Sequence, residues 1–347
     1  MTSIAFDFRP LQLEFITPAR TSRDVMYVKP SWIIYLRDPA SGKTGIGECS
    51  IIPGLSSDDP SHLEATLHEL RSLHDADVFN PENFIELPAL RFALETAWRS
   101  LQADAPFELW PSPFTQGKAC IPINGLIWMG DDDAVLKQIR DRANEGFRIL
   151  KMKIGSGDFP SELKLLQKIR DEYPARDFEL RLDANGAFHP PEAQNKLEQL
   201  AKFNIHSIEQ PIRPRQWDAL AKLCAHSPIP IALDEELIGL PVDGAFLDRI
   251  QPQYLILKPS LLGGFAVSTA WAEAAAERGM GWWATSALES NIGLNAIAQW
   301  CAAMKTTLPQ GLGTGRLYTN NIAAPLRIAD AALCMGHDVW DLGTFAP

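Results

Sequence analysis

The chain has 347 residues, of which 46% are hydrophobic and 22% are charged, which is the ordinary composition of a globular protein. Its formal net charge of −11 argues against nucleic acid or an anionic membrane as a partner, because both need clustered positive charge. No apolar run approaches the roughly 20 residues of a membrane helix, and residues 1–10 lack the basic and apolar regions of a signal peptide.

The first third of the chain has the pattern of strands followed by helices. Alternating residues indicate an antiparallel meander, and small and apolar residues at helical spacing follow it. We therefore predict an α+β domain over residues 1–115, with the tail, residues 320–347, packing back on it. The strands and then the helices are expected at residues 4–15, 31–37, 44–50, 61–73 and 87–101.

From residue 116 to residue 319, short β-branched runs alternate with amphipathic helices, with a repeat of about 25 to 30 residues. Eight such units fit, which predicts a closed parallel (β/α) barrel. An open doubly wound sheet is disfavoured because no glycine-rich phosphate loop follows the first strand. The strands are expected at residues 119–128, 149–154, 178–182, 207–209, 229–233, 254–257, 281–285 and 310–312.

The five cysteines are widely scattered and form no CxxC pair or Cys/His cluster, so the sequence suggests neither a zinc site nor a disulfide framework. Reduced thiols in a cytoplasmic protein are expected. The five are Cys49, Cys120, Cys224, Cys301 and Cys334. The sequence leaves the oligomeric state open, and a homo-oligomer is compatible with it.

Two lysines, Lys151 and Lys153, lie two residues apart in the second predicted barrel strand. Side chains at i and i+2 of a strand point to the same face, so both are expected to project into one interior. A buried ammonium is costly unless it is paired, and two neighbouring ammonium groups lower each other's pKa, which is how a lysine becomes a base. The alternative is an edge strand with two solvated lysines.

Charged residues also end the next four strands, at the edge where a parallel barrel has its active site. Asp183, Glu209 and Asp234 end the third, fourth and fifth strands, and Lys258 ends the sixth. Three converging carboxylates require a cation, and all-oxygen ligation suits Mg²⁺. Each residue taken singly is as well explained as a helix N-cap or a solvated loop residue. The run over five successive strands favours a site for a small-molecule carboxylate substrate.

With these motifs in place, the chain resembles the enolase superfamily, and within it the muconate-lactonizing subgroup. The matching motifs are Lys151-x-Lys153, Asp183-Ala184-Asn185, Glu209-Gln210-Pro211, Asp234-Glu235 and Lys258-Pro259. The resemblance implies an α/β fold, a modified TIM barrel of the (β/α)₇β type with an α+β capping domain built from both chain ends. It also implies one Mg²⁺, with Mn²⁺ as a substitute, held by Asp183, Glu209 and Asp234.

Within the subgroup, the chain looks most like the dehydratases of menaquinone biosynthesis. The features concerned are Arg181, residues 286–291 and residues 311–321. Gly313-Thr314-Gly315 stands where dipeptide epimerases carry an acidic motif for a substrate ammonium, which argues against an amino-acid substrate with a free amine. N-acylamino acid racemases and cycloisomerases of the subgroup share the catalytic residues and remain alternatives. A non-catalytic barrel is a remote alternative, because such a relative would typically have lost a metal ligand or a lysine, whereas all six of these positions are filled here.

The resemblance also implies roles for the lysines. Lys153 removes the proton α to the metal-bound carboxylate, and Lys258 stabilises the enediolate from the opposite face, after which a β-hydroxyl leaves as water. Lys151 helps to keep Lys153 neutral. This lysine and Mg²⁺ scheme is the known pattern of enolase-superfamily sites rather than a derivation from these residues.

Four further residues are candidates for substrate binding. Arg181 is expected to orient Lys151 or the carboxylate, with a structural ion pair as the alternative. Asn185 is expected to support the site. Ser286 and the backbone N–H groups near Leu288 are candidates for a distal carboxylate, with a serine cap as the alternative. Residues 18–24 are expected to form a lid over the site.

Overall fold

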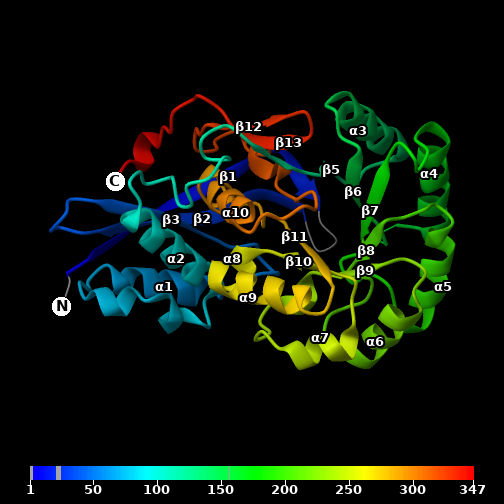
Figure 1. Ribbon diagram of the computed structural model, residues 1–347, viewed down its shortest axis with the longest axis horizontal. Helices are drawn as coiled ribbons and strands as arrows, with labels where there is room; N and C mark the ends of the chain where they lie inside the picture. Colours follow the sequence, from blue (N-terminus) through cyan, green and yellow to red (C-terminus); the bar gives the residue numbers. More distant parts are fainter. Residues whose placement is uncertain (1–2, 21–24, 156) are drawn as a thin grey trace.

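The computed structural model describes residues 3–20, 25–155 and 157–347 (Figure 1). The N-terminal part holds a three-stranded antiparallel sheet in the order β1-β2-β3. Helical segments follow it in the chain and cover one of its faces. The strands are β1 (Ala5–Arg20), β2 (Val25–Arg37) and β3 (Thr44–Ser50), and the helices are α1 (Pro60–Leu70), η1 (Ala76–Phe79), η2 (Pro81–Phe84) and α2 (Pro88–Gln102).

This sheet is buried on both faces in its central strand, which explains why β2 is apolar without strict alternation. Trp32 and Ile34 pack with α1 and α2, whereas Ile33 and Tyr35 on the opposite face pack with Ile292 and other residues from the second half of the chain. Burying one face on the helices and the other on the barrel side fixes how the N-terminal part sits over the rest. We call residues 3–115 of this arrangement the cap.

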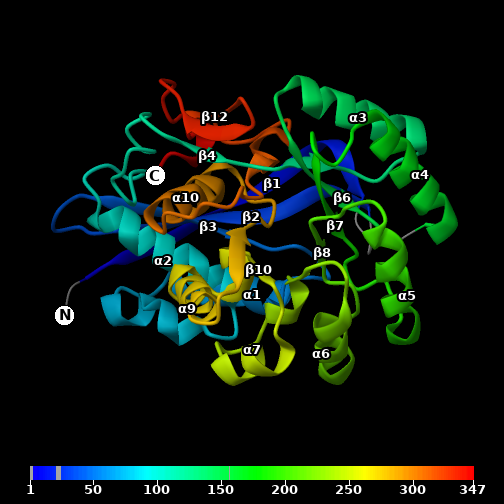
Figure 2. The same cartoon turned by 45° about the vertical axis from the view of Figure 1, so that its right-hand side comes forward.

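The second part is a parallel sheet of seven strands in the order β11-β10-β9-β8-β7-β6-β5, with helices outside it (Figures 1 and 2). The strands are β5 (Gly125–Ile127), β6 (Ile149–Lys153), β7 (Glu179–Asp183), β8 (Ser207–Glu209), β9 (Ile231–Leu233), β10 (Tyr254–Leu257) and β11 (Gly281–Ala284). The helical segments are α3 (Asp132–Asn144), α4 (Phe159–Glu172), α5 (Pro190–Ala201), α6 (Trp217–His226), η3 (Glu235–Leu237), α7 (Gly244–Ile250), α8 (Pro259–Leu262), α9 (Phe265–Ala276), α10 (Asn291–Ala303) and η4 (Gly313–Arg316). A further short helix in the C-terminal tail, η5 (Gly343–Phe345), lies against β2 of the N-terminal sheet.

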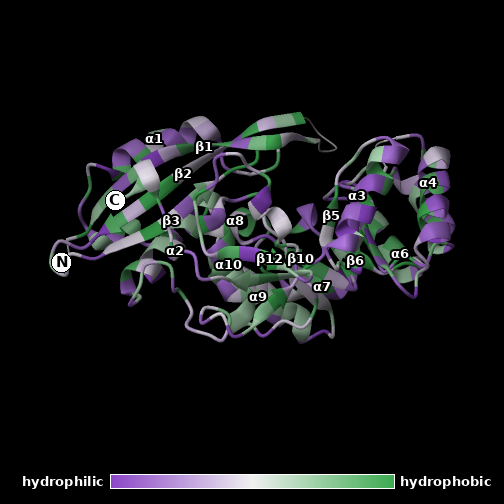
Figure 3. Cartoon of the chain, turned by 90° about the horizontal axis from the view of Figure 1, so that it is seen from above, coloured by the Kyte–Doolittle hydropathy of each residue, from purple (hydrophilic) through white to green (hydrophobic). Residues whose placement is uncertain are grey.

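A short extended segment lies between the two edges of this sheet. Gly311 forms a parallel bridge with Thr285 after β11, and Gln310 forms a parallel bridge with Ile123 before β5. The Gln310 side chain adds a bond, accepting from the Ala284 amide at 2.7 Å. The eighth predicted strand is therefore this segment, and the architecture is the expected (β/α)₇β barrel with a separate antiparallel cap. Figure 3 shows hydrophilic residues over the outer helices α3 and α4 and hydrophobic residues toward the interior.

The prediction that residues 119–128 form a single barrel strand is wrong. These residues are divided into β4 (Cys120–Pro122) and β5, and only β5 belongs to the barrel. β4 pairs antiparallel with β13 (Ala332–Met335), which also pairs with β12 (Leu326–Ala329). Pro122 has no N–H group to continue a ladder, which ends the strand at that residue.

The C-terminal tail contacts both parts of the molecule. Asn320 accepts from the Glu14 amide at 2.9 Å and donates to Gln12 O at 2.7 Å, both on β1. Tyr35 of β2 donates to Phe345 O at 2.5 Å. β12 and β13 lie instead beside β4 at the start of the barrel. The domain boundaries at residues 115 and 319 stay a prediction. Within the described residues, no helix is long and apolar enough to cross a membrane.

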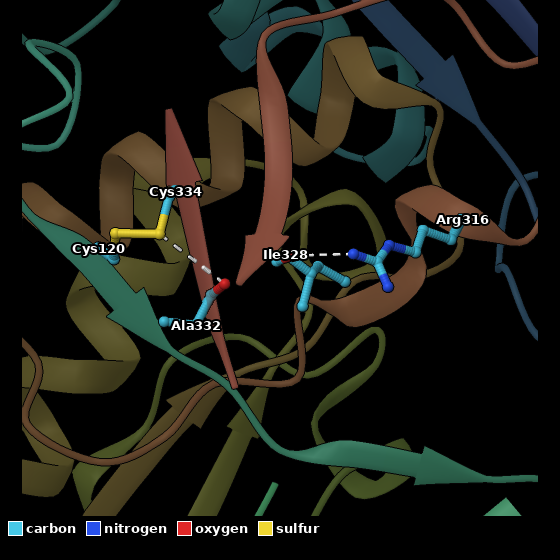
Figure 4. Close-up of a disulfide and its surroundings, with 5 residues drawn as sticks. All are labelled: Cys120, Arg316, Ile328, Ala332 and Cys334. Atoms are coloured by element: carbon cyan, nitrogen blue, oxygen red, sulfur yellow. Dashed lines mark hydrogen bonds between the residues drawn. A yellow bond between two sulfur atoms is a disulfide. The ribbon is translucent and has the colours of Figure 1, made fainter. Parts of the chain in front are cut away.

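A disulfide joins Cys120 to Cys334, which face each other in the β4–β13 pair with Cα atoms 4.5 Å apart (Figure 4). The expectation that all five cysteines are reduced is therefore wrong for this pair, whereas the other three are free and buried. The two cysteines are 214 residues apart in the chain. The bond encloses the whole barrel in one covalent loop.

We expect removal of this bond to lower stability substantially. Cross-linking over 214 residues restricts the unfolded chain by an amount on the order of 5 kcal/mol in the chain-entropy model. The double variant Cys120→Ser/Cys334→Ser should therefore melt roughly 5–10 °C below the oxidised wild type in scanning calorimetry. Reduced wild type should match the double variant. A double variant whose Tm still falls on adding reductant would show that another process is responsible.

Candidate active site

A cavity lies where the carboxyl ends of the barrel strands face the cap. The cap contributes Met26 of β2 and residues of the loop after β3, so the cavity is lined by both parts of the molecule. The β1–β2 hairpin extends toward the barrel near β6 (Figures 1 and 2). Residues 21–24 of the predicted lid lie outside the described residues. The lining residues are Met26, Ile52, Pro53, Leu55, Asn124, Leu126, Trp128, Lys151, Lys153, Asp183, Asn185, Glu235, Lys258, Thr285, Ser286, Ala287, Leu288, Gly311, Gly313 and Thr314.

Strand register brings the predicted site residues together. Lys153 of β6 is directly opposite Asp183 of β7, and Asp183 is directly opposite Glu209 of β8. Asp234 and Lys258 directly follow β9 and β10, the next two strands of the same sheet. Parallel strands end at one edge, so residues that end successive strands become neighbours although they are far apart in sequence.

The lysines contact the carboxylates directly. Lys151 Nζ lies 2.7 Å from Glu209 Oε1 and 3.0 Å from Asp183 Oδ2. Lys153 Nζ lies 3.2 Å from the same Asp183 oxygen, and Lys258 Nζ pairs with Asp234 Oδ2. The three carboxylate residues are each 2% exposed. This is a buried network of alternating charge, in which each partner depends on the other.

The surroundings shift the pKa values of these groups in opposite directions. Burial, and next the negative charge of Asp183, raise the pKa of the Glu209 carboxyl to about 8. Burial alone would lower the pKa of Lys151, but Asp183, Glu209 and Asp234 together outweigh it and raise that pKa. Lys258 behaves in the same way, with Asp234 as its main partner. Asp183 shows the opposite shift, because burial alone would raise the pKa of its carboxyl but Lys151, Lys153 and Lys258 together outweigh burial and lower it. The three lysines thus already face the three carboxylates, and a metal cation would relieve the remaining repulsion that Asp183 and Asp234 exert on Glu209.

The donor set fits Mg²⁺ by its chemistry. Asp183, Glu209 and Asp234 supply hard oxygen ligands from three adjacent strands, which suits this ion. As the side chains stand, no group of three His, Cys, Asp or Glu residues within the described ranges is arranged to enclose a metal. The reason is local, because each of the three carboxylates turns an oxygen to a lysine ammonium.

Asn185 lies beside the lysine at the edge of the cavity. Its side-chain Oδ1 accepts from Lys153 Nζ, and its Nδ2 donates to Glu235 Oε1 at 2.9 Å. Its backbone N donates to Asp183 Oδ1 at 3.0 Å, with a left-handed φ of 44°. Asparagine tolerates this conformation better than most residues. Asn185 therefore contacts both Lys153 and Asp183, and its supporting role in the site stays a prediction.

Arg181 does not line the cavity. It pairs with Lys151 in the β6–β7 register, but its guanidinium donates to Glu179 Oε1 at 3.0 Å and to Pro309 O at 3.0 Å. Its guanidinium also lies over the ring of Trp283, 4.2 Å from the centroid. A role in orienting Lys151 or a substrate carboxylate is not supported by these contacts. The structural ion pair, the alternative interpretation, accounts for this residue.

Ser286 and Leu288 line the cavity but have no free donor. The Ser286 hydroxyl donates to Glu289 Oε2 at 2.5 Å, and the Leu288 amide donates to Ser286 Oγ at 3.0 Å. Both groups would have to give up an existing bond to bind a carboxylate. The expected contact between these donors and a distal substrate carboxylate is therefore not supported by this arrangement.

Several cavity residues were not predicted from the sequence. Asn124 is 4% exposed and lines the cavity, and its Oδ1 has no hydrogen-bond partner within the described residues. It fell inside a predicted strand that the structure divides. Met26 and Leu55 come from the cap, and Thr314 from η4. No pattern in the sequence marks Met26 and Leu55, because their position depends on how cap and barrel meet, whereas Thr314 stands in the Gly313-Thr314-Gly315 segment that the resemblance placed near the substrate.

Comparison with known proteins agrees with this geometry. The model of the family described as "Enolase C-terminal domain-like" matches residues 134–334. The o-succinylbenzoate synthase of Desulfotalea psychrophila is 45% identical, over 94% of this chain and 98% of that protein. The crystal structure of MenC from Desulfotalea psychrophila superposes with a TM-score of 0.85 at 43% identity, covering 96% of this chain and 99% of that one. Muconate lactonizing enzyme from Pseudomonas fluorescens, at 23% identity and a TM-score of 0.83 over 96% and 94% of the chains, shares the fold.

Proposed function

The chain belongs to the enolase C-terminal domain-like family, and we propose that within it the protein is an o-succinylbenzoate synthase. This enzyme is a Mg²⁺-dependent lyase that dehydrates 2-succinyl-6-hydroxy-2,4-cyclohexadiene-1-carboxylate in menaquinone biosynthesis. The observation that carries the proposal is the 45% identity to a synthase over nearly the full length of both chains. The cavity supports it with lysines on both flanks of three carboxylates.

Lys153 is the proposed base. Its side chain is 15% exposed at the cavity, and its amine is oriented by Asn185 Oδ1 and Asp183 Oδ2. Lys258 approaches from the opposite flank, four strands away in the sheet order from β6 to β10. Lys153 takes the proton α to the carboxylate, while Lys258 remains an ammonium that offsets the negative charge developing on the substrate.

Dehydration also removes a hydroxyl group on the neighbouring carbon. The C–O bond breaks as its electron pair leaves with the oxygen, the C=C bond completes the aromatic ring, and the proton held by Lys153 goes to the departing hydroxyl to form water. Lys153 then returns to its neutral form. Lys151 contacts Glu209 and Asp183 and is less exposed than Lys153, at 8% against 15% of the side chain, so we assign it as a cation for the substrate carboxylate rather than as the base.

Asp183, Glu209 and Asp234 are the residues that would hold Mg²⁺. When bound, the ion would supply Lewis-acid stabilisation of the substrate carboxylate. Lysine ammonium groups already contact all three residues. Loading the metal therefore requires these ion pairs to loosen.

The cytoplasmic location and the homo-oligomer stay predictions. The Cys120–Cys334 disulfide weighs against a permanently reducing compartment, where such bonds are rare. The small-molecule substrate fits a cavity enclosed by cap and barrel.

The test is conversion of the cyclohexadiene carboxylate to o-succinylbenzoate, followed as loss of the substrate's absorbance. We expect turnover with Mg²⁺, loss of at least about 100-fold of it on treatment with EDTA, and recovery with Mg²⁺ or Mn²⁺ but not Ca²⁺, which prefers longer bonds and more ligands. Calorimetric titration of the EDTA-treated protein with Mg²⁺ should give one site. Full activity in EDTA would refute the metal assignment, and no conversion under any condition would refute the substrate.

A further inference from the structure

A fully buried carboxylate, Glu289, lies behind the cavity wall. It is 0% exposed, and each of its oxygens accepts one serine hydroxyl. Ser260 Oγ donates to Oε1 at 2.5 Å, and Ser286 Oγ donates to Oε2 at 2.5 Å. Both contacts are short charge-assisted bonds, which are stronger and more directional than bonds between neutral groups.

The two serines come from different strand ends. Ser260 lies in α8, two residues after Lys258, and Ser286 follows β11 and lines the cavity. Lys258 and α8, which follows it directly, are called the Lys258 segment below. Glu289 therefore connects this segment to the neighbouring wall of the cavity. The start of α9, which follows α8 in the chain, is held by the cap, because Glu95 of α2 accepts from the Phe265 and Ala266 amides at 2.5 and 3.0 Å.

Glu289 also determines how Ser286 bonds to the rest of the wall. With its proton directed to Glu289, Ser286 Oγ accepts from the Leu288 amide at 3.0 Å and from Thr314 Oγ1 at 2.8 Å. One donor and two acceptor sites are the full capacity of a hydroxyl. Leu288, held in this way, has a φ of 66°, a left-handed conformation that is costly for a branched side chain and persists only when its surroundings enforce it.

We propose that Glu289 is a positioning residue for the reaction, which fixes the Lys258 segment against the cavity wall made by Ser286, Leu288 and Thr314. The inference rests on the proposed function for the meaning of Lys258 and goes beyond it, because Glu289 touches neither substrate nor metal ligands. Its carboxylate acts through Ser260 on one side and through Ser286 on the other.

The chain offers a matched control in Glu48 of β3. Glu48 is also 0% exposed and accepts from Ser290 N at 2.8 Å, from Ser290 Oγ at 2.5 Å and from Gly293 N at 2.9 Å. Both carboxylates act on the buried ammonium of Lys29. Glu48 joins the cap to the start of α10, but its partners do not line the cavity. Glu48→Gln and Glu289→Gln therefore remove the same buried charge, and only the second disturbs the cavity wall.

The experiment compares these two variants of the full chain. A glutamine at position 289 has one acceptor oxygen and one NH₂ donor, so one of the two serine hydroxyls loses its acceptor and must receive a bond instead. Whichever serine this is, the pair of charge-assisted bonds that links Ser260 to Ser286 is broken. We expect both variants to lose similar thermal stability. At a temperature well below either Tm, kcat should fall at least about tenfold in Glu289→Gln, more than KM changes, and less than about twofold in Glu48→Gln. Equal kcat in the two folded variants would overturn the proposal.

Two further measurements keep the test decisive. Ser286→Ala should lower kcat by a similar factor, and adding Glu289→Gln to it should cost little more, because both act through one bond. If the double variant lost as much kcat as the product of the two single losses, Glu289 and Ser286 would act independently, which would contradict the proposal. A crystal structure of Glu289→Gln should show the Lys258 segment displaced from the cavity wall, and a crystal structure of Ser286→Ala, which removes the acceptor of the Leu288 amide, should show that amide released as well. An unchanged wall would refute the positioning role even if the substrate assignment itself fails.

Discussion

Lys153→Ala is expected to lower kcat by about 10²–10⁴-fold, the range that positioned acid–base groups supply. The amine of Lys153 is the group at the cavity that Asn185 and Asp183 hold in place, and alanine leaves no base at that position. Neighbouring Lys151 does not replace it, because its amine is held between Glu209 and Asp183 and its side chain is only 8% exposed, against 15% for Lys153. Steady-state rates and the yield of o-succinylbenzoate give the measurement.

The control for this variant is Mg²⁺ binding. Asp183, Glu209 and Asp234 are unchanged in Lys153→Ala, and the Lys153–Asp183 ion pair that competes with a metal is removed. Calorimetric affinity for Mg²⁺ should therefore be retained or increased. Lys168→Ala, at an exposed ion pair with Asp132 on the outer helices, should leave kcat unchanged. Activity of Lys153→Ala within tenfold of wild type would refute the assignment of the base.

The charged strand ends were predictable from sequence because two simple periodicities govern them. Residues two apart on a strand share a face, which groups Lys151 with Lys153. Parallel strands end at one edge, which groups Asp183, Glu209 and Asp234 although about 25 residues separate each from the next. The register observed between β6, β7 and β8 needs no information beyond these rules, and so the centre of the site could be located before the fold was known.

The surroundings of the site could not be predicted in the same way. Ser286 and Leu288 lie at the cavity as expected, but their donors are engaged through Glu289 and Ser286, and a sequence does not say which of several acceptors a hydroxyl will choose. Arg181 has the right face of β7 but lies deeper in the barrel, where Glu179 and Pro309 O are nearer. The two-residue period of a strand determines which face a side chain lies on. The contacts that the side chain then makes at its level in the barrel depend on the residues that pack there.

The disulfide shows a third limit. Cys120 and Cys334 become partners only because β4 leaves the barrel and pairs with β13 of the tail. The sequence pattern assigned residues 119–128 to one strand, so Cys120 had no partner in that interpretation. Pro122 was the available signal, since a proline inside a predicted central strand argues against that assignment.

Lys258 provides the test that separates dehydration from racemisation. In the dehydratase, Lys258 is a cation facing the developing negative charge, so Lys258→Met is expected to lower kcat by about 10²–10³-fold. Lys258→Arg keeps a positive charge beside Asp234 and should retain at least about tenfold more activity than the methionine variant. A racemase needs a second base on this flank, and an arginine, which remains protonated, cannot serve as one.

The two variants should therefore be assayed on two substrates. With the cyclohexadiene carboxylate, the arginine variant is expected to exceed the methionine variant. With N-succinyl amino acids in deuterated water, proton NMR should follow exchange of the α-proton in the wild type and in both variants. We expect no interconversion of the two enantiomers by the wild type, and interconversion that both variants abolish would support the racemase alternative. If arginine and methionine abolish dehydration equally while both fold and bind Mg²⁺, Lys258 donates or accepts a proton in the reaction. That outcome would refute a purely electrostatic role for Lys258.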